Sequence, residues 1–225
     1  MGSTYLTTVY ATDEDIYNES SADWGTIVPK SNRYASGCDG TFAALAPWTM
    51  TSASNLFGSQ GVVSGQVVKL FGPPASFGAP QYLAIDSATD AGGLVLRRCG
   101  FAVGEGLPPA PATGLNGLAF EILSLKPQIE RTAYELDQRY AVDPFMPNRQ
   151  PANIYDQRVF RRLTALHVLY SQYAGMNRSK AGDFADKVSF YKSEYQAALD
   201  AAQVRWGAMG TSQPPTGALS TKICR

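Results

Sequence analysis

Residues 155–174 read YDQRVFRRLTALHVLYSQYA, and this stretch decides the expected fold. Its apolar side chains recur at alternating steps of four and three residues, which places them along one face of an α-helix. They are Val159, Leu163, Leu166, Tyr170 and Tyr173. A helix with one apolar face needs a neighbour to cover that face. The stretch therefore predicts a helix from about Ile154 to Gly175, a suitable C-terminal glycine, within a helical bundle.

Two flanking segments repeat the same spacing. The upstream set is Ile129, Ala133, Leu136 and Tyr140, and the downstream set is Phe184, Val188, Tyr191, Tyr195 and Ala198. The first set predicts a helix that begins after Ser124, a good N-cap, and ends near Val142. The second set predicts a helix that begins between Ser179 and Asp183 and ends at Trp206.

The N-terminal region carries the start signal of a fourth, short helix. Thr12 with Asp15 resembles a capping box, and the acidic run from Asp13 to Asp15 suits the positive end of a helix dipole. We expect this helix to reach about Glu19 and to complete a four-helix core. A cation site formed by the three acids is the alternative, and capping accounts for them better.

Short runs rich in Val, Leu and Ile follow, separated by Gly and Pro turn signals. They are residues 48–54, 61–71, 81–86 and 92–99. Such runs are typical of antiparallel strands, so we expect a small β-barrel or curled sheet from about Thr41 to Val103. Residues 107–117, LPPAPATGLNG, read as a link between this sheet and the helices.

Residues 207–225, GAMGTSQPPTGALSTKICR, end the chain without a helical pattern. The pair Pro214-Pro215 and the glycines disfavour a helix, and little apolar area remains to bury. The segment predicts an extended C-terminal arm. The expected fold is α+β, divided into an N-terminal helical segment (1–40), a β insertion (41–106), a helical bundle (107–206) and the arm (207–225).

Composition restricts the class of protein. The formal net charge is zero, which gives no reason to expect a general nucleic-acid or membrane binder. Cys38, Cys99 and Cys224 are widely spaced and odd in number, which favours a reducing compartment over a disulfide framework. The sequence has no secretory signal and no apolar run of membrane-spanning length, so we expect no membrane partner.

Residues suited to catalysis are few, and we expect no enzyme, metal or cofactor. His167 is the single histidine and is interpreted as structural. Asp86 and Asp90 flank a turn, where an aspartate bonds readily to its own backbone. The alternative hypothesis is a small enzyme that uses these two acids together with Arg97.

A basic cluster is the more suggestive feature. Arg158, Arg161 and Arg162 lie three and four residues apart beside the apolar stripe, and Arg149 precedes them. One interpretation is a solvated helix face. The functional alternative is a patch that pairs with acidic residues of a neighbouring subunit or faces passing DNA.

Three phrases of the sequence resemble a known family. They are residues 92–143, GGLVLRRCGFAVGEGLPPAPATGLNGLAFEILSLKPQIERTAYELDQRYAVD, residues 155–174 quoted above, and residues 180–199, KAGDFADKVSFYKSEYQAAL. In these phrases and in its layout the chain resembles the head-to-tail connector (adaptor) proteins of tailed bacteriophages. A tail-terminator or other neck protein and a capsid decoration protein are the alternatives within the virion.

The resemblance implies a structural virion protein that is assembled in the host cytoplasm. Its subunits would form a ring, typically a dodecamer, beneath the portal and link it to tail or neck proteins. The C-terminal arm would reach onto the portal, and DNA would pass through the channel. The partner-binding residues implied are Arg158, Arg161, Arg162, Met209, Pro214, Pro215, Leu219 and Ile223.

Overall fold

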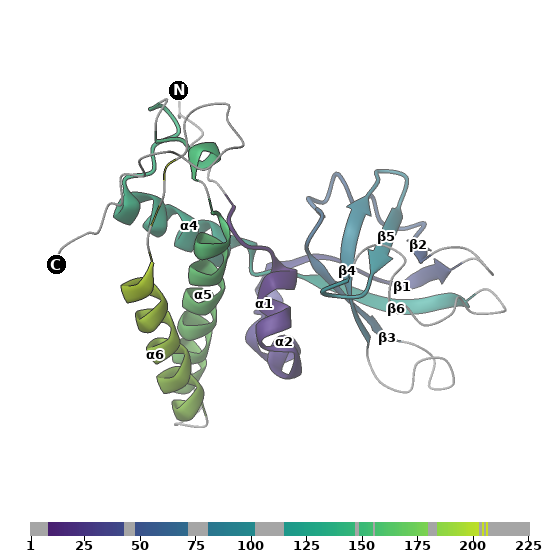
Figure 1. Ribbon diagram of the computed structural model, residues 1–225. Helices are drawn as coiled ribbons and strands as arrows, with labels where there is room; N and C mark the ends of the chain where they lie inside the picture. Colours follow the sequence, from purple (N-terminus) through teal and green to yellow (C-terminus); the bar gives the residue numbers. More distant parts are fainter. Residues whose placement is uncertain are drawn as a thin grey trace. The chain divides into compact units, whose positions relative to one another are not determined.

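A computed structural model describes residues 9–42, 48–71, 81–101, 115–146, 149–154, 156–179, 184–202, 204 and 206. The chain divides into two compact units, which are described separately. Residues 12–125 make a barrel unit, and the described residues of 1–11 and 126–225 make a helical unit. The predicted mixture of helices and strands is therefore confirmed (Figure 1).

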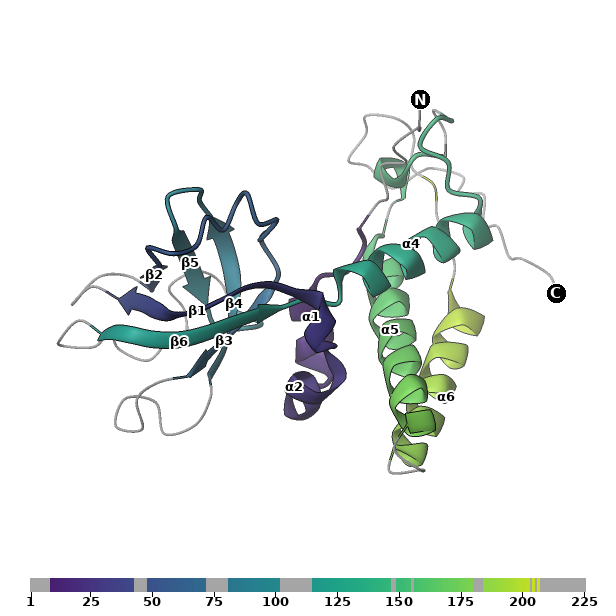
Figure 2. The same ribbon diagram turned by 180° about the vertical axis from the view of Figure 1, so that it is seen from behind.

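In the described part of the barrel unit, six antiparallel strands close on themselves in the order β1-β2-β5-β4-β3-β6. The strands are β1 (Arg33–Phe42), β2 (Thr49–Thr51), β3 (Val67–Phe71), β4 (Gln81–Ala88), β5 (Gly93–Arg97) and β6 (Leu115–Leu123). Figure 2 shows β1 and β6 as long neighbouring strands. Their pairing closes the barrel. Of the two predicted forms, a barrel or a curled sheet between about Thr41 and Val103, the structure has the barrel, and it extends beyond these bounds at both ends.

The barrel is filled by its own inward side chains. On β6, Leu118, Phe120 and Ile122 alternate inward and are all nearly fully buried. Phe57, from the loop after β2, is fully buried, and its ring lies 5.7 Å from the Phe120 ring. A continuous apolar interior of this kind supplies the main stabilisation of a small barrel.

Helices α1 (Asp13–Glu19) and α2 (Trp24–Ile27) belong to the barrel unit. The predicted capping box at Thr12 is confirmed, because its hydroxyl accepts from the Asp15 N–H and Asp15 accepts from the Thr12 N–H. The expectation that this helix completes a four-helix core is wrong, because Asp13 and Glu14 are buried against partners in the barrel unit.

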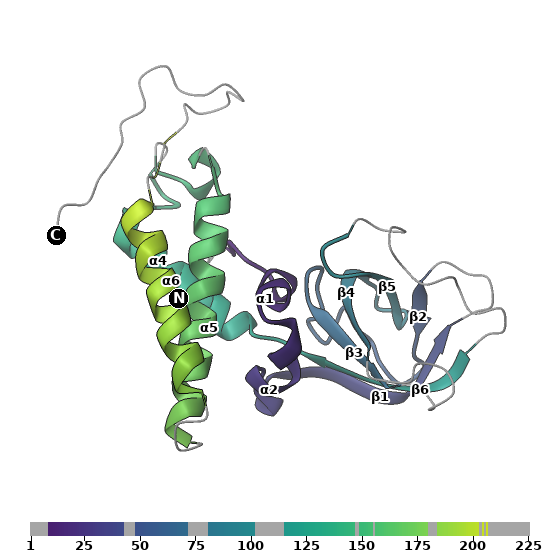
Figure 3. The ribbon, with the colours of Figure 1, turned by 60° about the horizontal axis from the view of Figure 1, so that its bottom comes forward.

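The described part of the helical unit contains α4 (Lys126–Tyr140), α5 (Arg158–Ser179) and α6 (Ala185–Ala201), with a 3-10 helix at Pro151–Asn153 before α5. Figure 3 shows α5 and α6 side by side, with α4 crossing them. The bundle among the described residues thus has three helices rather than four. The predicted end of the second helix at Gly175 is wrong, because α5 runs on to Ser179 and a mid-helix glycine lowers stability only by about 1 kcal/mol.

Helix α4 ends in a left-handed turn. Ala141 has a φ of 53°, and the N–H of Val142 bonds to the carbonyl of Asp137 at 2.9 Å. This is the bond pattern of a Schellman motif, with alanine where glycine is usual. The turn directs the chain out of the helix into the segment before α5.

The predicted apolar stripes are covered to different degrees. All four residues of the α4 stripe are buried, and so are Leu163, Leu166 and Tyr173 on α5. On α6, Tyr191 is buried, but Val188, Tyr195 and Ala198 are only partly covered. Helix α6 therefore leaves apolar surface outside the core of its own unit.

Replacing Leu166 with alanine is expected to lower the free energy of unfolding of the helical unit by about 3 kcal/mol. Its side chain is 4% exposed on the covered face of α5, so truncation would leave a cavity. Urea unfolding followed by the helical circular dichroism signal measures the loss. The matched control is Ser171→Ala on the exposed face of the same helix, and equal stabilities of the two variants would contradict the assigned face.

Candidate functional site

An open groove lies between the start of α5 and the end of α6, with a volume of about 280 Å³. Its lining residues are Asp156, Arg158, Val159, Arg162, Leu163, Ala198, Ala201 and Ala202. The floor is apolar, because alanines on α6 face the Val159 and Leu163 side chains of α5. The small alanine side chains leave space that larger residues would fill.

Two of the predicted arginines border this groove. The Arg158 Nε lies 2.9 Å from the Asp156 carboxylate, and Arg162 lies 3.5 Å from Glu194 of α6. The Arg158 side chain and its backbone N–H both donate to Asp156 and hold the pKa of that carboxyl below its usual range. Both arginine side chains are mostly exposed, so these pairs contribute little stability.

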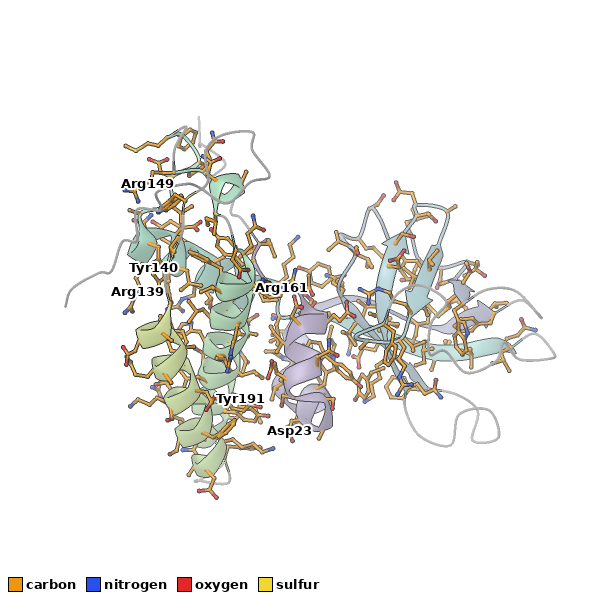
Figure 4. The ribbon with its side chains drawn as sticks, in the orientation of Figure 1. Asp23, Arg139, Tyr140, Arg149, Arg161 and Tyr191 are labelled. Carbon is orange, nitrogen blue, oxygen red and sulfur yellow. The ribbon has the colours of Figure 1, made fainter. Side chains whose placement is uncertain are left out.

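The other two arginines do not join them. Arg161 is exposed on α5 but does not line the groove. The Arg149 guanidinium lies over the Trp206 ring, 4.9 Å from its centroid. Figure 4 shows Arg149 and Arg161 well apart in the helical unit. The four predicted arginines therefore do not form one cluster. Two border the groove, one is exposed elsewhere on α5, and one is stacked on Trp206.

His167 is partly buried in the helical unit. It shares a hydrogen bond of 3.1 Å with the Thr132 hydroxyl, and its ring lies 4.8 Å from the Tyr195 ring. Burial lowers its pKa, while the Glu135 carboxylate, 3.8 Å away, acts in the opposite direction. The neutral imidazole therefore bridges three helices, which supports the structural interpretation.

The acids and the arginine of the alternative enzyme hypothesis lie in the barrel unit. Arg97 makes a two-armed ion pair with Glu14 and lies 3.7 Å from Asp86. Asp90 accepts instead from the Ser59 hydroxyl at 2.9 Å. Arg97 thus connects β5 to α1, and Asp90 has a different partner from Asp86.

The described cysteines are free. Cys38 is exposed, whereas burial raises the pKa of the Cys99 thiol to about 12. Cys99 therefore stays protonated at neutral pH and is a poor nucleophile or metal ligand. Within the described part of the chain, no group of three or more His, Cys, Asp or Glu side chains is placed to hold a metal ion.

Sequence reasoning missed a buried pair in the helical unit. The Tyr10 hydroxyl donates to Asp137 of α4 at 2.5 Å, and both residues are less than a tenth exposed. Burial raises the pKa of Asp137 to about 6, although the bond from Tyr10 acts in the opposite direction. Asp137 follows Leu136 on the helix, and nothing local in the sequence marks it as buried. Its partner Tyr10 is 127 residues away in the sequence.

Stability of the helical unit is expected to depend on the ionisation of the buried Asp137 between pH 4 and pH 7. The pKa of Asp137 is higher folded than unfolded, so its favourable contribution is complete below about pH 4 and is lost as the pH rises through about 6. Asp137→Asn should therefore match wild type near pH 4 and exceed it by about 3 kcal/mol at pH 7.5. Urea unfolding of both proteins across this range measures the difference, and parallel pH profiles would contradict it.

The remaining predicted partner residues are those of the arm. Met209, Pro214, Pro215, Leu219 and Ile223 lie outside the described residues. Sequence reasoning also did not single out the alanines of the groove or two exposed side chains after α4, Phe145 and Met146. Alanine carries no chemical signal of its own, and exposure follows only from the fold.

No protein-family model, curated protein or solved structure matches this chain. None of the described helices is long and apolar enough to cross a membrane. The geometry itself defines the class: a mixed helical and β protein with a closed antiparallel barrel and a helical unit that bears an arginine-bordered apolar groove.

Proposed function

We propose that this chain is a structural virion protein, a head-to-tail adaptor whose subunits form a ring beneath the portal and connect it to the tail. The observation that carries the proposal is the surface of the helical unit. Phe145, Met146, Phe190 and Tyr134 are 50–71% exposed there. Large exposed apolar side chains are candidates for protein–protein contacts, and aromatic and Met side chains are enriched at such contacts.

The arginines supply a polar border for such a contact. Arg158 and Arg162 border the apolar groove, and Arg161 lies exposed on the same helix. Arginine is enriched at protein interfaces because its planar guanidinium group binds carboxylates through two hydrogen bonds. In the proposed ring these three residues meet an acidic surface of the adjacent subunit, while residues 207–225 bind the portal.

Mass photometry of the full chain, alone and with the portal protein of the same phage, tests the proposal. We expect rings that bind the portal, and cryo-electron microscopy of the complex should place them beneath it. A stable monomer that ignores the portal would overturn the proposal. Rings that assemble but never bind the portal would favour a tail-terminator or a capsid decoration protein instead.

Two variants separate the proposed contacts. Reversing the charges with Arg158→Glu, Arg161→Glu and Arg162→Glu should weaken ring formation, whereas Lys192→Glu on exposed α6 surface is the matched control. Deleting residues 210–225 should remove portal binding and leave the ring intact. Retention of portal binding by the deletion variant would contradict the role assigned to the arm.

A further inference from the structure

The segment after α4 presents two exposed apolar side chains. Phe145 is 71% exposed and Met146 is 56% exposed. The Asp143 carboxylate accepts from the Phe145 N–H at 2.8 Å, and its carbonyl accepts from the Met146 N–H at 3.2 Å. The Met146 carbonyl in turn accepts from the Arg149 N–H at 2.9 Å. We name Phe145 and Met146 together the apolar knob.

Restrained geometry favours binding. These hydrogen bonds restrain the backbone of Phe145 and Met146, so less of its conformational freedom remains to be lost when a partner covers the knob. Exposure of this size leaves most of the Phe145 ring in contact with water. Covering it would therefore release apolar surface from water, which is the main driving force for association.

The groove between α5 and α6 has the complementary character. Its floor is formed by the apolar groups of Val159, Leu163 and the α6 alanines, and its volume is about 280 Å³. That space suits one or two large side chains. The knob does not fill the groove of its own chain, because it is exposed and is absent from the lining residues.

Charge also favours contact between the knob and the groove. Asp143 lies at the base of the knob, and the nearby Arg149 guanidinium is stacked over Trp206. The groove is bordered by the exposed Arg158 and Arg162 side chains. A knob entering the groove would bring the carboxylate of Asp143 toward these arginines, in addition to apolar contact.

We propose that the occupant of the groove is the apolar knob of a second copy of this chain. Every copy carries one knob and one groove, so each subunit can engage two neighbours. Such a head-to-tail contact generates a ring when the rotation between copies closes. This inference rests on the proposed ring and names the surfaces that would hold it together.

The test uses two variants of the full chain, one for each surface. Phe145→Asp removes the knob, and Ala201→Trp fills the groove from an exposed position on α6. Each is expected to abolish rings in mass photometry, with at least a tenfold loss of assembled species at the concentration where wild type assembles. Leu56→Asp, at an exposed apolar side chain of the barrel unit that belongs to neither surface, should assemble normally. Thermal melting verifies that all three variants fold.

Mixing the two variants gives the decisive readout. The Ala201→Trp chain retains its knob and the Phe145→Asp chain retains its groove, so the mixture should form one-to-one dimers that cannot extend. Rings that persist in both single variants would overturn the inference and leave the proposed function standing. Loss of portal binding with intact rings in Ala201→Trp would assign the groove to the portal and also overturn it. A wild-type dimer that both variants disrupt would support the contact and overturn the proposed ring.

Discussion

Replacing Glu14 with alanine is expected to lower the free energy of unfolding of the barrel unit by about 4 kcal/mol. The Glu14 carboxylate receives both arms of the Arg97 guanidinium and the N–H of Gly100 at 2.8 Å. The Glu14 and Arg97 side chains are 10% and 18% exposed. Removing the acid leaves a largely desolvated guanidinium with the Phe101 carbonyl at 3.0 Å and Asp86 at 3.7 Å, which do not replace a two-armed ion pair.

Tryptophan fluorescence can follow the barrel unit selectively. Trp24 and Trp48 belong to the barrel unit, whereas Trp206 belongs to the helical unit. In a Trp206→Phe background, urea unfolding followed by fluorescence therefore reports on the barrel. The matched control is Glu19→Ala on the exposed end of the same helix, which should change stability by less than about 0.5 kcal/mol.

A double-mutant cycle distinguishes the ion pair from simple loss of packing. Breaking a buried pair from one side is more harmful than removing both charges, because only the single change leaves an unpaired charge. Glu14→Leu combined with Arg97→Met should therefore be more stable than Glu14→Ala alone. A double variant as unstable as the sum of its single changes would show that the two residues do not act as a pair.

The strands that sequence patterns missed are the two that close the barrel. β1 contains Gly37 and Gly40, which lower strand propensity, and both glycines are required by the packing. A Cβ on Gly37 would lie 2.9 Å from the Phe120 ring, and one on Gly40 would lie 2.9 Å from the Leu118 carbonyl oxygen. The low strand propensity of glycine therefore hid β1 in the sequence, although β6 packs so closely that these two positions need glycine.

β6 carried a signal that could have been used. Leu118, Phe120 and Ile122 alternate with less buried residues, which is the two-residue period of a strand with one covered face. The neighbouring Pro- and Gly-rich stretch obscured this alternation. By contrast, the stripes of α4 and α5 are long and regular, and long periodic helices are the elements that sequence patterns predict best.

The site was predictable only in part. The positions of Arg158 and Arg162 beside the α5 stripe follow from helical spacing, so their presence on one border could be foreseen. The groove itself depends on which residues of α6 face α5 near its end, and this requires the packing of two helices. The partner of Glu14 is 83 residues away in sequence, so no local pattern could identify Arg97.

Replacing Phe160 with alanine is expected to lower the free energy of unfolding of the helical unit by about 4 kcal/mol. Phe160 of α5 is fully buried, and its ring lies 4.6 Å from the Tyr10 ring and 5.2 Å from the Tyr140 ring. Truncation would create a cavity and would also remove the surface against which Tyr10 is held. The Tyr10 hydroxyl would then bond less firmly to Asp137, so part of the loss should come from that bond.

A graded series tests this mechanism because it separates cavity formation from loss of the ring contacts. Phe160→Leu retains most of the buried volume and should lower stability by only about 1 kcal/mol, while Phe190→Ala, at an exposed ring, should have almost no effect. Urea unfolding followed by the helical circular dichroism signal measures all three. In a Tyr10→Phe background the effect of Phe160→Ala should shrink, because the hydroxyl bond is already absent. An undiminished effect would mean that Phe160 supports the helices independently of Tyr10.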